Sequence, residues 1–248
     1  MKKILPLYLF LFSLHSSAQR DSASPSKIGG LFKKANSILN SGKPTSNSLS
    51  TDEIVSGLKE ALTLGAQKSS DRLSLTDGFF KDAVVKVLMP PEAVKVENKL
   101  RTLGMGQLVD NAILSMNRAA EDASKSAAPI FIDAIKKMTV QDALGILRGA
   151  DTAATVYLKR TTSPQLTAAF SPVIETSLQN VNATKYWKDL FTAYNKVSFT
   201  KVDTDLSSYV TAKALNGIFY YVAEEEKKIR LNPAERVSDI LRKVFGNK

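Results

Sequence analysis

One run of polar residues in this 248-residue sequence has the residue types and spacing of a binding site. In the run Ser115–Glu121, Asn117 and Glu121 lie one helical turn apart, and Arg118 can reach Asp122 or Glu121. These polar groups stand beside an apolar, Ala-rich face. They could line a ligand pocket, or they could join two helices. We take Asn117, Arg118 and Glu121 as candidate ligand-binding residues.

A second polar group follows about forty positions later in the sequence. Arg160, Thr161 and Thr162 place a fork-shaped donor beside hydroxyl groups, just before Ser163 and Pro164. Ser-Pro is typical of a helix start, and a helix N-terminus with an adjacent Arg suits an anion. A plain helix cap with a surface Arg explains the same residues. Arg160, Thr161 and Thr162 are therefore candidates that await the geometry.

Carboxylates are the only general acid and base groups with wide reach in this sequence. The candidates are Glu121, Asp122, Asp133, Asp151 and Glu224–Glu226. Two of them facing one cleft about 5 to 10 Å apart would permit glycoside hydrolysis. Pairing at four-residue spacing, Glu224 with Lys228 and Glu226 with Arg230, accounts more simply for the glutamate cluster as a solvated charged face.

Most other chemistry is excluded by composition. The chain has no Cys, and its single His is His15. This excludes disulfides, thiolate or His metal sites, Cys nucleophiles and triads with a His base, so no cofactor and no metal are expected. The pair Gly104 and Gly106 lacks the third Gly of a dinucleotide loop and favours a turn between helices. Ser-x-x-Lys at Ser56 lacks the other motifs of acyl enzymes.

Residues 1–18 have the layout of a cleavable signal peptide. Lys2 and Lys3 precede the apolar run Ile4–Leu14, and small residues ending at Ala18 precede a cut before Gln19. An apolar run of this length is too short to span a membrane, and without Cys the ordinary bacterial lipoprotein route is closed. We expect an exported, soluble protein, periplasmic or secreted, that is not a lipoprotein and has no transmembrane segment in the mature chain.

The charge is basic, with 34 Lys plus Arg against 24 Asp plus Glu, a formal net charge of +10. Removal of residues 1–18 takes away two Lys and no acid, and leaves +8. In the cell envelope this charge favours an anionic envelope component as partner rather than nucleic acid. A basic surplus that only keeps the protein soluble is the simpler interpretation.

The domain organisation follows from a change in composition near residue 50. Residues 19–50 contain eight Ser and two Pro and are predicted to be a flexible arm or linker. Residues 51–248 are long enough for one helical domain with its own core. A structural role, in which the basic segment Lys27–Lys43 touches anionic membrane and the domain acts as a spacer, stays open.

Helical periodicity dominates this domain. Capping boxes at Ser50–Glu53 and Thr139–Asp142 predict helix starts, and Gly149 predicts a stop. Further helices are predicted over 108–123, from Pro129 to 138, from Asp151 to Arg160, and over 206–228. Short helices are predicted to begin at Ser163-Pro164 and Ser171-Pro172, and a last one at Asn232-Pro233, ending at Gly246.

Evidence for strands is limited to 84–89 and 197–202, either of which can be extended without joining a sheet. The sequence therefore predicts an all-α fold. We expect an irregular single-domain bundle of roughly eight to ten short and medium helices, with at most minor extended segments.

Four runs in the sequence resemble a known family. They are Thr76–Phe80, Ser115–Glu121, Arg160–Thr162 and Glu224–Arg230 through Phe245-Gly246. In this order they resemble a bacterial envelope family catalogued as domain of unknown function 4197, over about residues 52 to 246. The resemblance implies a mainly helical exported domain and no activity. One departure is Val84–Pro91, where Lys86 and Met89 interrupt a stretch expected to be aliphatic.

These observations favour a non-enzymatic binding or interaction protein of the cell envelope that holds a small or amphipathic ligand, or a protein partner, between helices. The alternative is a carboxylate-dependent hydrolase that acts on envelope polysaccharide or peptidoglycan. Whether the protein is an enzyme is left open by the sequence, which leans against it.

Overall fold

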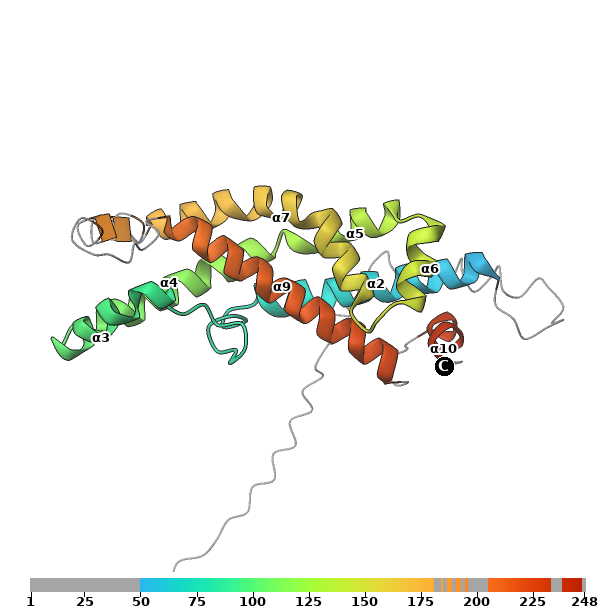
Figure 1. Cartoon of the computed structure of the whole chain (residues 1–248), viewed down its shortest axis with the longest axis horizontal. Coiled ribbons are helices and arrows are strands. Elements are labelled where there is room, and N and C mark those ends of the chain that lie inside the picture. The colour runs from blue at the N-terminus through green and yellow to red at the C-terminus, as the bar shows by residue number, and fades with distance from the viewer. Residues whose placement is uncertain are drawn as a thin grey trace, which may run out of the picture. The chain divides into compact units, whose positions relative to one another are not determined.

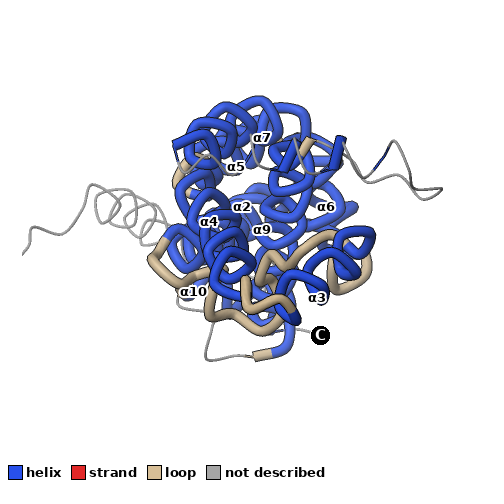
Figure 2. Tube along the Cα trace, turned by 90° about the vertical axis from the view of Figure 1, so that its left-hand side faces the viewer, coloured by secondary structure: helices blue, strands red, loops and turns tan. Residues whose placement is uncertain are grey.

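The structure of the chain is a computed structural model that describes residues 50–180, 184, 187–188, 191–192, 195, 205–232 and 238–246. These residues belong to one compact unit, 49–248. Helices and connecting loops make up this unit, and its described residues contain no strand (Figures 1 and 2). The all-α, single-domain prediction is confirmed. The predicted signal peptide, the Ser-rich arm and the possible strand at 197–202 lie outside the described residues.

The elements follow one another in a simple order. They are α2 (Thr51–Ser74), η1 (Pro91–Ala93), α3 (Val94–Thr102), α4 (Gly106–Ser124), α5 (Ala127–Lys137), α6 (Val140–Arg148), α7 (Ala153–Asn180), α9 (Leu206–Leu231) and α10 (Asp239–Gly246).

Helix starts read from local spacing agree with the structure. The side chain of Ser50 accepts the N–H of Glu53, and the Glu53 carboxylate accepts the N–H of Ser50, which makes a complete capping box for α2. Thr139 and Asp142 do the same for α6, and Gly149 caps its C-terminus. Such caps depend on residues three apart and therefore need no knowledge of the tertiary structure.

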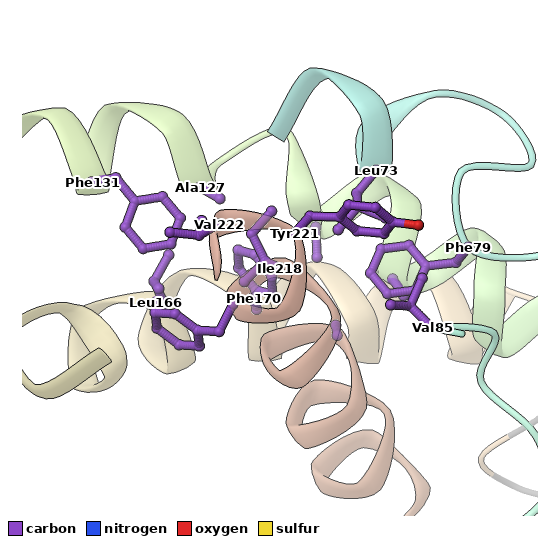
Figure 3. Close-up of a cluster of buried hydrophobic side chains, with 14 of the residues drawn as sticks. Leu73, Phe79, Val85, Ala127, Phe131, Leu166, Phe170, Ile218, Tyr221 and Val222 are labelled. Atoms are coloured by element: carbon purple, nitrogen blue, oxygen red, sulfur yellow. The ribbon is translucent and has the colours of Figure 1, made fainter. Parts of the chain in front are cut away.

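The core forms where α9 packs against α2, α4 and α7. Figure 3 shows the residues at its centre, where Ile218 and Val222 of α9 meet Leu166 and Phe170 of α7, with Phe131 of α5 beside them. Phe131 also meets the ring of Phe219 edge-on, with 5.6 Å between the ring centroids. This packing fixes the helices that carry the polar clusters.

The helix α7 corrects the prediction of separate short helices at Ser163-Pro164 and Ser171-Pro172. It runs without interruption from Ala153 to Asn180 and contains Pro164 and Pro172. A proline inside a helix removes one hydrogen bond and costs about 3 kcal/mol. A ladder of buried residues at four-residue spacing crosses both prolines and offsets this cost: Leu158, Thr162, Leu166, Phe170, Ile174 and Leu178. The described residues consequently contain somewhat fewer helices than predicted.

Three further points concern residues 75–105 and Asn232. The segment 84–89, which the sequence left open as a strand or as extended backbone outside a sheet, is not a strand; its residues form turns and irregular backbone between α2 and η1. The helix α3 was not predicted, although η1, which directly precedes it, has Pro91 at its first position and Glu92 next, a pattern typical of a helix start. Asn232, predicted to begin the last helix, is the C-cap of α9, and residues 233–237 are outside the described part.

Candidate functional site

The predicted residues Asn117, Arg118 and Glu121 lie beside a long loop, residues 75–90, which we call the anchored loop. The loop leaves α2 with Asp77 at a φ of 71° and then passes Gly78. A Cβ atom at Gly78 would lie 2.5 Å from the carbonyl oxygen of Arg72 and 2.8 Å from that of Leu73. Only glycine fits where two backbone segments approach so closely, so the turn Thr76–Phe80 requires glycine at position 78.

Glu121 is the centre of the contacts that hold this loop. Its Oε1 accepts the backbone N–H groups of Phe79 and Phe80, both at 3.1 Å. Its Oε2 accepts a hydrogen bond of 2.6 Å from the guanidinium of Arg118. The carboxylate is buried, and these contacts occupy both of its oxygens. The buried carboxylate thus supplies hydrogen-bond acceptors to the N–H groups of Phe79 and Phe80, which lie in a loop and not in a helix or sheet.

Arg118 continues the network to the start of the loop. Its other terminal nitrogen donates to Asp77 at 2.7 Å, and Lys81 approaches the second oxygen of Asp77 at 2.8 Å. Hydrogen bonds from Lys81 and Arg118 lower the pKa of Asp77 below its usual value. Those from Glu121 and Asp77 raise the pKa of Arg118. The guanidinium is thus paired with two carboxylates.

Asn117 holds the far part of the loop. Its Oδ1 accepts the N–H of Val87 at 2.8 Å, and its Nδ2 donates to the carbonyl of Val87 at 2.8 Å and to that of Ile113 at 2.7 Å. The side chain is completely buried. The amide therefore pairs with Val87 as a neighbouring strand would, and a ligand would have to displace these bonds.

The loop is also held at Asp82, which the sequence did not suggest. We call these contacts the Asp82 clamp, and the contacts of Asn117, Arg118 and Glu121 the α4 clamp. The carboxylate of Asp82 accepts the N–H groups of Val84 and Val85, a hydrogen bond from Arg72, and the hydroxyl of Tyr221 on α9. Burial opposes its ionisation, but the bonds from Tyr221, the backbone and Arg72 outweigh it and lower the pKa of Asp82 to about 2. Burial and the bond to Asp82 raise the pKa of Tyr221 to about 12. The spacing from Asp82 to Val84 is that of an Asx turn and was a detectable signal.

The other predicted cluster has a different environment, in the middle of α7. Thr161 donates its hydroxyl to the carbonyl of Tyr157 at 2.9 Å, and Thr162 donates to that of Leu158 at 2.6 Å. Arg160 and Thr161 are exposed, whereas Thr162 is buried. Because α7 does not begin here, the expected helix N-terminus is absent and its N–H groups are not available to an anion. No described contact joins Arg160 to Arg118.

A large open space lies along the first half of α4, and we call it the apolar cavity. Its volume is about 730 Å³. Helices α3 and α4 form two walls, and the start of α9 adds Leu206. Trp187 and Phe191, whose rings lie 4.4 Å apart, close another side. Ser115 and Met116 of the predicted run line this cavity, but Asn117, Arg118 and Glu121 are not among its described lining residues.

The polar groups of the cavity are paired along their own helices. Glu97 accepts a hydrogen bond from Arg101 at 3.0 Å, and it is the one charged side chain in the described lining. Asn111 accepts from Gln107, and the hydroxyl of Ser115 donates to the carbonyl of Asn111, both at 2.8 Å. The remaining described lining is aliphatic, aromatic or Met. The cavity therefore offers an apolar surface with a few polar groups at its edge.

The apolar cavity and both clamps of the anchored loop fall within one region of family similarity. A family model matches residues 48–246 and is described as a protein of unknown function, DUF4197. The chain belongs to this family. No curated protein and no solved structure was found to match the chain.

The runs that carry the DUF4197 resemblance have structural roles. Thr76–Phe80 belongs to the first part of the anchored loop, and Ser115–Glu121 includes three residues that hold the loop. From Glu224–Arg230, Glu226 accepts the N–H groups of Ala154 and Thr155 and so caps the start of α7. Arg230 pairs with Glu226 at 2.9 Å. Both side chains are 4% exposed, so this predicted pair is buried and is not part of a solvated face.

The departure from the family pattern also has a place in the DUF4197 chain. Val85 and Val87 are buried, and Lys86 lies over the ring of Phe80 with 4.2 Å between its Nζ and the centroid. Met89 lines the apolar cavity. Lys86 thus contacts an aromatic ring, and Met89 borders the apolar cavity.

The carboxylates proposed for hydrolysis are dispersed over the DUF4197 chain. Asp122 pairs with Lys125 at 2.6 Å, and Asp133 pairs with Lys137 at 2.7 Å; both acids are about half exposed. Asp151 is exposed. No group of three or more possible metal ligands occurs among the described residues. Over the same residues, no helix combines the length and the apolar composition that crossing a membrane requires.

Proposed function

We propose that this DUF4197 chain is a non-enzymatic binding protein that holds an apolar or amphipathic small molecule in the apolar cavity. The observation that carries the proposal is a space of about 730 Å³ with apolar walls between α3, α4 and Trp187. Ligand pockets commonly measure about 300 to 1,000 Å³ and have mainly hydrophobic walls. The polar clusters, in contrast, have their partners within the chain.

The place of action that we propose is the cell envelope. Support comes from residues 1–18, which have the charged start, apolar run and small residues of a cleaved signal peptide. The mature chain would then be periplasmic or secreted. Its positive net charge favours contact with anionic envelope components.

The chemistry of the lining supports an apolar ligand over an anionic one. Glu97 would repel an anion, and the adjacent Arg101 is paired with both Glu97 and Asp110. Each methylene that enters the cavity from water contributes about 0.8 kcal/mol. A hydrocarbon chain of moderate length can therefore bind without an ionic contact.

The test uses Trp187, which is the only Trp of the chain and lines the cavity. The neutral apolar fluorophore N-phenyl-1-naphthylamine accepts energy from Trp and reports its own binding. We expect the mature chain to bind it with efficient transfer from Trp187. Ala112→Phe fills the cavity from α4 and is expected to weaken binding by at least about tenfold, that is about 1.4 kcal/mol.

The matched control is Ala168→Phe, because Ala168 is exposed on α7 and is not among the described residues of the cavity wall. This variant should bind the fluorophore as the wild type does. Circular dichroism verifies that both variants are folded. Absence of binding to the wild type, or equal binding to Ala112→Phe, would contradict the proposal.

A further inference from the structure

The exposed large apolar side chains of the described residues are concentrated near the cavity. There are eleven of them, and five lie between residues 88 and 108: Leu88, Val94, Leu103, Met105 and Leu108. The connection between α3 and α4, the first residue of α3 and the first turn of α4 thus carry apolar side chains in contact with water. Such patches mark interaction sites in proteins.

Two of these side chains, Leu103 and Met105, lie at the tip of a helical hairpin. Helix α3 packs on α4, and Figure 1 shows their connection at one end of the helical unit. The connection contains Leu103, which is 61% exposed, Gly104 with a φ of 78°, and Met105, which is 41% exposed. Nothing lies within 4 Å of the position that a Cβ of Gly104 would occupy. The tip therefore projects without contacts that would bury its side chains.

The apolar surface of the tip is continuous with the cavity wall. Leu108 is 56% exposed and also lines the cavity. Val96 and Leu100 of α3 line it from the other side, and α3 has no buried residue. One short helix therefore separates the cavity from the outside, and a hydrocarbon chain can pass from the tip into the cavity along apolar side chains.

Charge at the hairpin indicates the partner. Lys95 and Lys99 are one turn apart on the exposed side of α3, and no described ion pair involves either of them. Arg101 is held by Glu97 and Asp110 at 3.0 and 2.8 Å. Exposed Leu and Met beside unpaired lysines are typical of surfaces that insert at the interface of an anionic bilayer.

We propose that the α3–α4 hairpin docks on an anionic phospholipid bilayer and that the cavity receives an acyl chain from it. Leu103 and Met105 enter the bilayer, and Lys95 and Lys99 meet the phosphates. The chain reaches the cavity past Leu108. This inference rests on the proposed function, since it names the ligand class of the same cavity and the source of that ligand.

The docking is tested by sedimentation of the mature chain with vesicles. Vesicles of phosphatidylcholine with one third phosphatidylglycerol should bind it, and vesicles of phosphatidylcholine alone should bind it less. The double variant Leu103→Asp, Met105→Asp should lose at least about tenfold in binding, because a charge at each position opposes insertion. Since both side chains are exposed, the fold should be retained.

Two controls separate this surface from other sources of membrane affinity. Val156→Asp changes a side chain that is 63% exposed near the start of α7, where an acid is tolerated, and should bind as the wild type does. Lys33→Glu, Lys34→Glu alters the basic segment Lys27–Lys43 instead. If this variant loses binding while the tip variant keeps it, the hairpin is not the docking surface.

The entry of a chain is tested with vesicles whose acyl chains carry bromine, which quenches Trp on contact. Quenching of Trp187 in the wild type and its loss in Ala112→Phe are expected. Docking without quenching would overturn the acyl-chain ligand. No docking, with N-phenyl-1-naphthylamine still bound, would overturn this inference and leave the proposed function in place.

Discussion

The two halves of α4 differ in the side chains that they present and in what those side chains contact. The second half presents Asn117, Arg118 and Glu121 to the anchored loop, and these polar side chains are paired with backbone groups or with opposite charges. The first half presents apolar side chains to a space of about 730 Å³. The comparison shows that the polar half of α4 stabilises the fold, whereas the mainly apolar half borders the space that can accept a ligand.

The physical reason lies in the backbone of the anchored loop. The N–H groups of Phe79, Phe80 and Val87 pair with side chains instead of with a helix or sheet. Buried backbone groups left without partners cost about 1 to 3 kcal/mol each. Glu121, Asn117 and Asp82 supply those partners. A loop of this kind needs clustered polar residues whether or not a ligand binds.

The largest effect is expected for Glu121→Ala. It removes the acceptor of two loop N–H groups and of Arg118, so the free energy of unfolding should fall by about 2 to 4 kcal/mol. Urea denaturation measures it. Asp122→Ala, at the neighbouring exposed acid, should change it by less than about 0.5 kcal/mol. Equal effects of the two variants would contradict the role of Glu121 in holding the anchored loop.

The second prediction concerns pH. The pKa of Asp82 is about 2 in the folded chain against an ordinary value of 3.8. A lowered pKa stabilises the fold above the ordinary value, and this stabilisation is lost as the pH falls from about 4 to about 2. Asp82→Asn should therefore lower the free energy of unfolding by about 2 kcal/mol at neutral pH, and much less near pH 2. A difference that does not depend on pH would contradict the Asp82 clamp.

A third prediction probes the packing of the loop on α9. A Cβ at Gly217 would lie 2.6 Å from Cε1 of Phe79, so Gly217→Ala should displace the loop and cost about 1 to 3 kcal/mol. Gly145→Ala, in α6, meets nothing within 4 Å and should stabilise the protein by about 0.5 to 1 kcal/mol. Thermal unfolding distinguishes the opposite signs; stabilisation by Gly217→Ala would show that Phe79 does not pack there.

The smallest effect is expected for Arg160→Ala. The side chain is exposed in the middle of α7, and its change should alter stability by less than about 0.5 kcal/mol. Binding of N-phenyl-1-naphthylamine should also stay the same, because Arg160 is not among the described lining of the cavity. A clear loss of fluorophore affinity would return the Arg160 cluster to the list of binding residues.

Capping and periodicity in the sequence predicted most helices of this fold, but they did not predict the apolar cavity. Capping boxes at Ser50 and Thr139 and the period of α9 depend on residues a few positions apart, which the sequence displays directly. The continuity of α7 across Pro164 depends on packing against other helices, which local rules do not include. Asn117, Arg118 and Glu121 were correctly expected to be together. Their use as loop anchors depends on residues 77 to 87, some thirty to forty positions away.

The cavity was missed because no motif encodes it. Trp187 lies about eighty to ninety positions after Val96 and Leu108, and none of the three belongs to a motif in the sequence. The space between them results from helices that do not close on one another. The unpredicted helix α3 supplies one wall, so missing that helix meant missing the cavity.

The most direct test of the central claim is native mass spectrometry of the mature protein purified from its own host. The wild type and Ala168→Phe should carry a small apolar or amphipathic molecule, and Ala112→Phe should carry none. A wild type without any bound molecule, or an Ala112→Phe protein that carries the same molecule, would contradict the claim that the apolar cavity is the binding site.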